Sequence, residues 1–230
     1  MLDIITKKEY FSWIDLGYTT PLKDALKSIQ DSFILSQLAG LKGKKIAEIG
    51  GGQSRVLEIL SNNNECWNID KIEGIGRGPK NYTEINNVKL IKTFMGDYSH
   101  ELKDNYFDVV FSISVVEHVK PEGLPDFFRD IARILKTDGL CIHAIDSYLG
   151  DLEYIRKNPK IDMYKTVAKK NNILLEFIEE PKIDSSSIFY TRYASNSDMT
   201  MMRWNKIVPT MVDIRNNCQS VSIKAAWKKV

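Results

Sequence analysis

The chain has 230 residues, enough for one α/β domain with a sizeable core or for two small domains at most. Its 43 % hydrophobic and 27 % charged residues are ordinary for a globular protein, and a formal net charge of +2 does not suggest a protein that coats nucleic acid. Three widely spaced cysteines favour free thiols in a reducing compartment over disulfides or a zinc site. These are Cys66, Cys141 and Cys218.

The amino-terminal sequence carries no targeting signal. MLDIITKKEYF lacks both the long apolar segment and the small-residue cleavage site of a signal peptide. No stretch of the chain approaches the roughly 20 apolar residues that span a bilayer. We therefore expect a cytoplasmic protein without a membrane partner.

The first elements expected are helices and one buried strand. Apolar residues recur at spacings of three to five between residues 7 and 40, which predicts helix with Pro21 near a start and Gly40 at an end. The short apolar run at 44–49 predicts a buried strand. A helix over 54–63 follows, with Ser54 as its amino-terminal cap.

Strands and helices continue to alternate. One helix is expected at 121–139, with Gly139 at its end. Strands are expected at 65–70, 88–93, 106–114 and 140–146. Beyond residue 150 the pattern weakens to a helix at 160–171 and strands at 173–178 and 219–230. The alternation predicts an α/β fold with a doubly wound, mostly parallel, Rossmann-like sheet and an amino-terminal helical extension.

The sequence IAEIGGGQSRVLEI, residues 46–59, places three glycines between a strand and a helix. Gly50, Gly51 and Gly52 would let a ligand lie against the main chain, and the helix start offers N–H groups to an anionic group. Asp70 follows the next strand, where a carboxylate can bind two ribose hydroxyls. Together these features favour a nucleoside-containing cofactor over a tight turn with a solvated aspartate.

The turn does not match a dinucleotide site. A G-x-G-x-x-G pattern fails because Arg55 stands where its third glycine belongs. Glu48 is poorly placed beside a pyrophosphate and better placed near a ligand with a cationic end. The chain also lacks the G-x-x-x-x-G-K-[ST] loop of nucleoside triphosphatases.

Five segments in order resemble the motifs of class I S-adenosylmethionine (SAM) dependent methyltransferases. IAEIGGGQS resembles the E-x-G-x-G loop, NID the acidic end of the second strand, and MGDY (95–98) the third-strand motif. FDVVFSISVVEHV (107–119) resembles the fourth-strand motif of small-molecule members, which ends in E-H-V. ILKTDGLCIHAID resembles the turn into strand five. The chain departs from the pattern at Ser54, which could narrow the pocket, and at Thr137–Asp138.

The resemblance implies SAM as the cofactor and S-adenosylhomocysteine as its product. Glu48 and the three glycines would hold the charged groups of the methionine part, and Asp70 would hold the ribose. Asp97 would accept from the adenine amino group, with Met95 or Tyr98 nearby. The positions that the resemblance assigns to the cofactor are Glu48, Gly50, Gly51, Gly52, Asp70, Asp97, Tyr98, Ser112 and Ser114. With no repeat or break in composition, we expect a single domain (1–230). It comprises a helical extension (1–40), a cofactor-binding core (41–147) and substrate-side insertions with terminal strands (148–230).

His118 is the best candidate for a general base, because it follows the fourth strand on the ligand-bearing edge. A structural histidine at a helix start is the equal alternative. Glu117 would orient His118 or cap the next helix, and Asp146 is a weaker site candidate. His143 lies inside an apolar strand, which favours a role in the core.

Several absences narrow the methyl acceptor. The chain has no D/N-P-P-Y/F run after strand four and no cysteine nucleophile at that edge, which disfavours nucleic acid. Only Asp146–Ser147 partly matches the carboxylates of metal-dependent relatives, so we predict no metal. The expected acceptor is a small molecule, such as a sugar or another hydroxylated intermediate. The alternatives are an RNA or protein methyltransferase, a SAM-binding protein without turnover and, last, a dehydrogenase.

Acceptor specificity is expected from the amino-terminal helices and from residues 148–215. An aromatic lid is one possibility there, and core packing is the alternative interpretation that the side chains favour. The aromatic candidates in the amino-terminal part are Tyr10, Phe11, Trp13 and Tyr18. The sequence does not indicate the oligomeric state.

Overall fold

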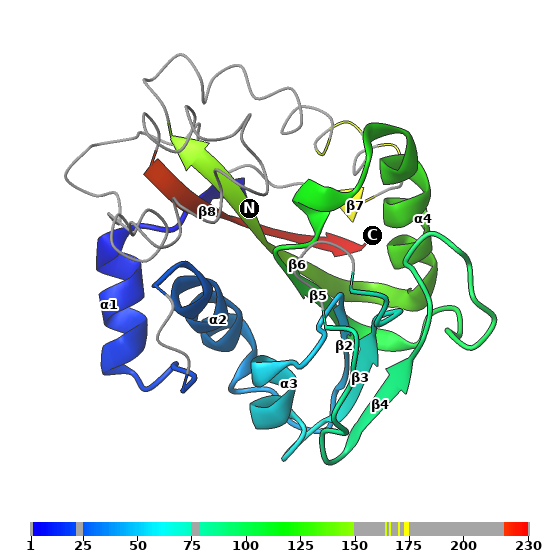
Figure 1. The fold of residues 1–230 in the computed structure, drawn as a ribbon, viewed down its shortest axis with the longest axis horizontal. Coiled ribbons are helices and arrows are strands. Elements are labelled where there is room, and N and C mark those ends of the chain that lie inside the picture. Colours follow the sequence, from blue (N-terminus) through cyan, green and yellow to red (C-terminus); the bar gives the residue numbers. More distant parts are fainter. Residues whose placement is uncertain are drawn as a thin grey trace.

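The computed structural model describes residues 2–21, 25–74, 79–149 and 219–229, together with residues 164, 166, 170, 173 and 174. One twisted sheet crosses the molecule and carries helices on both faces (Figure 1). The described helices are α1 (Lys7–Asp15), α2 (Ala25–Leu38), α3 (Arg55–Leu60) and α4 (Leu124–Ile134). The described strands are β1 (Leu2–Ile4), β2 (Lys45–Ile49), β3 (Glu65–Ile69), β4 (Val88–Ile91), β5 (Phe107–Ile113), β6 (Leu135–Leu149), β7 (Ile173–Leu174) and β8 (Gln219–Lys229).

The strand order is β1-β8-β6-β5-β2-β3-β4, with β7 paired to β8. Strands β2 to β6 run parallel, whereas β8 runs antiparallel between β6 and β1. From β2 the chain winds outward through β3 and β4 and then crosses back to β5 on the other side of β2. The prediction of a mostly parallel, doubly wound sheet is therefore confirmed, and the reversal of strand order lies between β2 and β5.

Alternate side chains of the central strands enter two separate apolar clusters, because successive Cβ atoms point to opposite faces of a sheet. Ile46 packs with α2 and α3, whereas its neighbour Ala47 packs with Phe127 and Phe128 of α4. Tyr10, Trp13 and Tyr18 pack partly buried against the first of these clusters, while Phe11 is 53 % exposed. For these three side chains core packing, the favoured alternative, is what the structure shows.

The caps of the short helices follow local sequence. The Ser54 hydroxyl accepts from the Leu57 N–H at 2.9 Å, which confirms it as the amino-terminal cap of α3. At α1, Thr6 and Glu9 bond each other's main chain in a capping box, which fixes where that helix begins.

The prediction of a helix that runs to Gly139 is wrong. Helix α4 ends at Ile134, and β6 begins with the next residue. The pairing of β6 with β5 then jumps from Leu135 opposite Phe107 to Leu140 opposite Val109. Gly139 lies in this irregularity, where an added Cβ would stand 2.8 Å from the Lys136 carbonyl oxygen. A close main-chain approach, not a helix end, requires the glycine.

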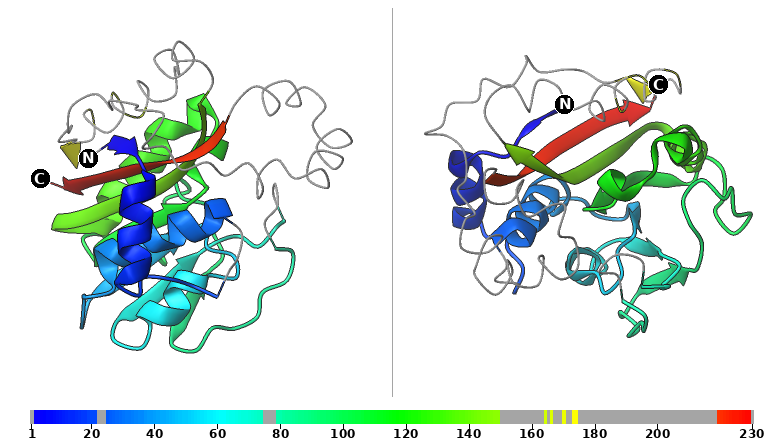
Figure 2. Two further views of the ribbon diagram at one scale, coloured as in Figure 1. Left: turned by 90° about the vertical axis from the view of Figure 1, so that its left-hand side faces the viewer. Right: turned by 45° about the horizontal axis from the view of Figure 1, so that its top comes forward.

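The amino-terminal part contains the expected helices and differs from the prediction in one way. Strand β1 precedes the helices as an edge strand. Figure 2 shows β1 beside β8, and residues 2–4 pair antiparallel with 223–225. A three-residue strand has no periodicity to detect, so only the distant partner strand creates it. The strand expected at 219–230 is confirmed as β8, whereas most of the expectations for 148–218 lie outside the described residues.

Candidate cofactor-binding and active site

The glycine turn after β2 is tightly enclosed by the protein itself. Gly50 and Gly52 have φ of 65° and 50°, a region that favours glycine. A Cβ on Gly50 would stand 2.5 Å from Val115 Cγ2, and one on Gly51 would stand 2.7 Å from Asn68 Oδ1. The turn thus needs glycine for its own packing, in addition to any contact with a ligand.

Asp70 lies directly against this turn, as its place after β3 predicts. Its Oδ2 accepts from the Gly52 N–H at 2.8 Å, and its Oδ1 accepts from the Ile72 N–H at 2.7 Å. Each carboxylate oxygen has a second lone pair, so a half-buried Asp70 can still accept from two ribose hydroxyls. Asn68 completes the turn by donating to the Gly52 carbonyl at 2.8 Å.

Glu48 lies beneath the start of α3 and is 4 % exposed. Its pKa is raised to about 8, chiefly by burial; the negative charges of Asp31 and Asp70 also raise the pKa, and the hydrogen bond that the Ser54 hydroxyl donates to Glu48 acts against them. The Ser54 side chain bonds Glu48 and caps α3, and its effect on the width of the pocket stays a prediction. The assignment of Glu48 to the methionine ammonium stays a prediction.

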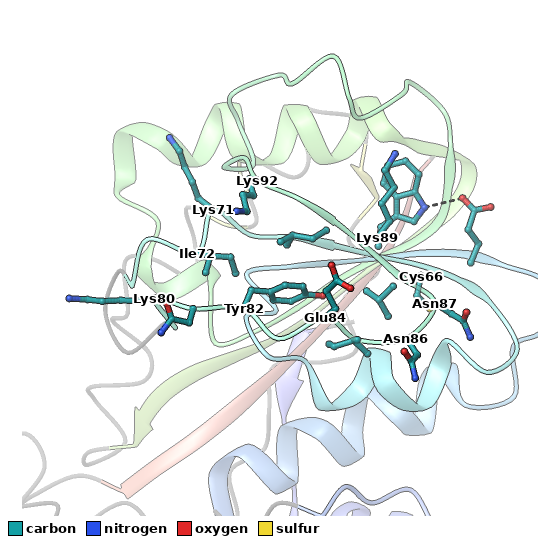
Figure 3. A pocket seen from close by; sticks show the side chains of 16 residues that line it. Cys66, Lys71, Ile72, Lys80, Tyr82, Glu84, Asn86, Asn87, Lys89 and Lys92 are labelled. Carbon is teal, nitrogen blue, oxygen red and sulfur yellow. Dashed lines mark hydrogen bonds between the residues drawn. The ribbon is translucent and has the colours of Figure 1, made fainter.

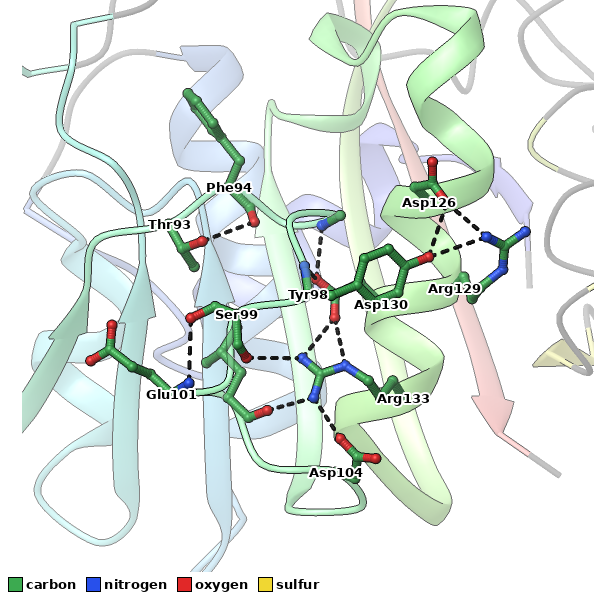
Figure 4. Close-up of polar contacts among 12 residues, drawn as sticks. Thr93, Phe94, Tyr98, Ser99, Glu101, Asp104, Asp126, Arg129, Asp130 and Arg133 are labelled. Atoms are coloured by element: carbon green, nitrogen blue, oxygen red, sulfur yellow. Dashed lines mark hydrogen bonds and ion pairs between the residues drawn. The ribbon is translucent and has the colours of Figure 1, made fainter.

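The loop after β4 carries Asp97 and Tyr98, whose side chains are both exposed. The Tyr98 hydroxyl donates to Asp126 of α4 at 2.9 Å, which holds the Tyr98 side chain against this helix (Figure 4). Met95 packs in the core and is 9 % exposed. Asp97 donates its main-chain N–H to the Phe94 carbonyl at 3.3 Å, and its contact with adenine stays a prediction.

His143 is a core histidine, as its apolar strand predicts. It is fully buried, and burial lowers its pKa to about 3. Its Nδ1 lies 2.7 Å from the Ser112 hydroxyl and its Nε2 lies 3.1 Å from Cys141 Sγ. The Ser112 side chain is therefore held in the core, and only its main chain remains for the predicted contact with the cofactor.

A polar cluster joins α2 to the carboxyl ends of β5 and β6. Ser114, with φ of 54°, donates its hydroxyl to Asp146 at 2.6 Å, and Lys27 donates to the Ser114 hydroxyl. Gln30 donates to Asp146 at 2.6 Å. We call Lys27, Gln30, Ser114 and Asp146 the edge cluster. Lys27 and Gln30 were not predicted from the sequence. The Gln-Asp-Ser run at 30–32 within the apolar pattern of α2 was a signal for polar partners, and the structure buries all three residues.

His118 ends a short 3-10 turn (Val116–His118) beyond β5, and its side chain is 70 % exposed. Its Nε2 lies 3.9 Å from Oε1 of Glu117, whose side chain is only 12 % exposed. Burial, the largest cause, and the negative charge of Asp146 together raise the pKa of Glu117 to about 8. The predicted base therefore lies beside a buried carboxyl group and near the edge cluster, while its catalytic role stays a prediction.

A separate hollow of about 1080 Å³ lies along β3 and β4, under the segment 80–87 (Figure 3). Tyr82, Lys71, Lys80 and Lys92 are among the side chains around it. None of the predicted site residues lines this hollow. The predicted residues lie instead at or beyond the carboxyl ends of β2, β3, β4 and β5, the edge of the sheet at which ligands bind in open α/β folds.

Two further observations concern only the part of the chain that the structure describes. Within it, no three His, Cys, Asp or Glu side chains come together as metal ligands would. None of the helices there has the length and apolar character that a bilayer crossing needs.

Comparison with known proteins identifies the class. Residues 47–143 match the family described as methyltransferase domain. Geranyl diphosphate C-methyltransferase of Streptomyces coelicolor A3(2) superposes with a TM-score of 0.56 at 10 % identity, covering 86 % of this chain and 76 % of that one. A candidate sarcosine dimethylglycine methyltransferase of Galdieria sulphuraria gives 0.55 at 13 % identity, with 95 % and 97 % covered. At sequence identities this low, the similarity shows a shared fold and nothing more.

A third structure of the same fold is phosphoethanolamine N-methyltransferase 2 of Haemonchus contortus, with a TM-score of 0.56 at 15 % identity. It covers 96 % of this chain, which spans 57 % of that longer protein. The search among curated proteins gave no significant match.

The matched residues include the glycine turn, Asp70, Asp97 and the E-H-V run, all on one edge of a doubly wound sheet. Over residues 47–143 the chain matches a methyltransferase domain, and its fold is that of SAM-dependent methyltransferases. The protein is therefore an enzyme, a methyltransferase that uses SAM.

Proposed function

We propose that this methyltransferase transfers the methyl group of SAM to a small molecule that carries a hydroxyl, such as a sugar or another hydroxylated intermediate. The observation that carries the proposal is the exposed side chain of His118 at the edge of the sheet. It lies three residues after Val115, the residue that packs against Gly50 of the glycine turn. The absence of nucleic-acid motifs from the sequence supports it. Relatives of the same fold are named for geranyl diphosphate and phosphoethanolamine, which are small molecules.

The residues at the strand edge fit the cofactor. Asp70 keeps free lone pairs for the two ribose hydroxyls while it holds the glycine turn. Asp97 presents an exposed carboxylate for the adenine amino group, and the main chain of Ser112 and Ser114 faces the methionine part in the proposed arrangement. SAM, when bound, supplies an electrophilic methyl group on a sulfonium.

The chain's own contribution is alignment of the acceptor and removal of its proton. In the proposed step the acceptor oxygen forms the new O–CH₃ bond as the S–CH₃ bond breaks. The hydroxyl proton passes to a ring nitrogen of neutral His118. Glu117, whose carboxyl group lies 3.9 Å from the His118 ring nitrogen, would orient the ring.

A transfer screen with tritium-labelled SAM tests the acceptor class directly. Sugars, small hydroxylated metabolites, RNA and protein are offered in parallel, and we expect label in a small hydroxylated product. Label in RNA or protein would contradict the proposal. Calorimetry with S-adenosylhomocysteine and NAD tests cofactor binding separately, because only S-adenosylhomocysteine should bind. Binding of S-adenosylhomocysteine without methyl transfer to any acceptor would indicate a SAM-binding protein without turnover.

His118→Ala tests the proposed base. We expect turnover to fall by about 100-fold, the usual contribution of a positioned base. The dissociation constant of S-adenosylhomocysteine should hardly change. His100→Ala is the matched control, because His100 is also exposed and follows a different strand. A rate within a few-fold of wild type for His118→Ala would assign this histidine a structural role.

The cytoplasmic location predicted from the sequence is part of the same proposal.

A further inference from the structure

The main chain around Asp97 is held in an unusual conformation. Gly96 and Tyr98, on either side of Asp97, have φ of 103° and 52°. A non-glycine residue in this region costs of order 1 kcal/mol and persists only where its surroundings hold it. Tyr98 therefore needs a specific partner that keeps the loop in this shape.

That partner is a single carboxylate oxygen. Oδ2 of Asp130, a fully buried residue of α4, accepts from the Gly96 N–H at 2.8 Å and from the Tyr98 N–H at 3.2 Å. The two N–H groups flank Asp97, whose own N–H bonds Phe94. The main chain on both sides of Asp97 is thus bound to one atom (Figure 4).

Asp130 is in turn fixed by Arg133, one turn further along α4. Arg133 Nε donates to Asp130 Oδ1 at 2.9 Å, and its Nη1 donates to the Leu102 carbonyl at 2.6 Å and to Asp104 at 2.5 Å. Burial acts to lower the pKa of Arg133, but the contacts with Asp104 and Asp130 outweigh it and raise the pKa. The guanidinium therefore stays charged and holds the loop's far end to the same helix.

The helix itself is a firm support. Phe127, Phe128 and Ile131 of α4 are buried in the core. The loop lies directly on the first turns of the helix, because a Cβ on Gly96 would stand 3.2 Å from the Phe127 main-chain nitrogen. The buried helix thus fixes Asp130, and Asp130 fixes the main chain on both sides of Asp97.

We propose that Asp130 is a positioning residue for recognition of the adenine of SAM, acting by fixing the loop that presents Asp97. This inference rests on the proposed contact between Asp97 and the adenine amino group. Loss of Asp130 should weaken binding of any adenosyl ligand, and it should weaken above all the selection of adenine over a base without the amino group.

The test compares S-adenosylhomocysteine with S-inosylhomocysteine, in which a carbonyl oxygen replaces the adenine amino group. The wild type should prefer the first, because the inosine oxygen faces the Asp97 carboxylate as a second acceptor. In Asp130→Asn the amide NH₂ must oppose either Arg133 or the two main-chain N–H groups. We expect the ratio of the two dissociation constants, measured by calorimetry, to fall about tenfold.

Two further variants provide a matched control and a test of the Asp97 assignment. Asp126→Asn is the matched control, because Asp126 lies on the same helix and bonds the Tyr98 hydroxyl rather than the loop's main chain. It should leave the ratio unchanged. Asp97→Asn should abolish the preference, and a failure to do so would instead overturn the adenine assignment on which the inference rests.

An unchanged ratio in Asp130→Asn, with a lowered ratio in Asp97→Asn, would overturn the positioning role. Partial unfolding does not obscure the outcome, because an inactive fraction multiplies both dissociation constants by the same factor. Should Asp130→Asn not fold, Asp130→Ser studied with a stabilising osmolyte answers the same question, since its hydroxyl is too short to reach both N–H groups.

Discussion

Asp70 and Asp97 follow neighbouring strands of one sheet, yet the protein holds them by different means. Asp70 accepts hydrogen bonds from the main chain of Gly52 and Ile72, so its partners belong to the glycine turn and to the turn that directly follows Asp70. Asp97 depends on Asp130, which is more than thirty residues further along the chain. The first region is built from local geometry and the second from a side chain on a distant helix.

The largest effect is expected where the local region is most crowded. Gly50→Ala brings its Cβ to 2.5 Å from Val115 Cγ2 at a φ of 65°. We expect strain and overpacking together to lower the free energy of unfolding by about 3 kcal/mol in urea titrations.

Gly43→Ala is the control for this change. Gly43 has a φ of 64°, but an added Cβ would meet nothing within 4 Å. It should lose only the backbone contribution, about 1 kcal/mol. Equal losses in the two variants would show that contact with Val115 does not matter.

Asp70→Ala is expected to have an intermediate effect, on binding. Removal of a carboxylate that accepts from ribose hydroxyls should weaken S-adenosylhomocysteine binding by about 1–3 kcal/mol in calorimetry. Affinity equal to that of the wild type would remove the ribose assignment and, with it, one side of the comparison.

The last expected effect is a pH dependence of stability from Glu48, which is spread over several pH units. Its pKa is near 8 in the folded protein against 4.5 ordinarily, so the folded state binds the proton more tightly. The stabilisation from this proton is complete below about pH 4.5 and is lost as the pH rises through 8, with a slope of at most about 1.4 kcal/mol per pH unit. Glu48→Gln should lack it.

Urea unfolding of both proteins between pH 4.5 and 8 measures the difference. The free energy of unfolding of the wild type should fall relative to that of Glu48→Gln as the pH rises. A constant difference across this range would mean that Glu48 is ionised in the folded protein. Glu117, whose pKa is also raised to about 8, contributes equally to both proteins and cancels.

The same contrast explains what the sequence could predict. The glycine turn, the Ser54 cap and the strand before Asp70 depend on residues close together in the chain, and the structure has each of them where the pattern places it. Periodicity also predicted the alternating strands and helices of the core. The order of motifs, together with one family's pattern, was enough to identify SAM as the cofactor.

The features that the sequence analysis missed depend on distant partners. Lys27 and Gln30 meet Ser114 and Asp146 only because α2 crosses the strand edge. From the sequence alone, Asp130 resembles a solvent-exposed polar position of a helix. Only the structure shows that the loop after β4 packs against it. The end of α4 was misplaced because a main-chain approach inside β6, not a helix stop, demands Gly139.

The pairing of β1 with β8 has a consequence for how the chain folds. Residues 2–4 pair with 223–225, whereas β2 pairs with a strand only twenty residues further on. Contacts between such remote segments form slowly, because a very long loop must close first. Until β8 arrives, β6 presents an open edge to other chains, so aggregation and refolding compete at this late step.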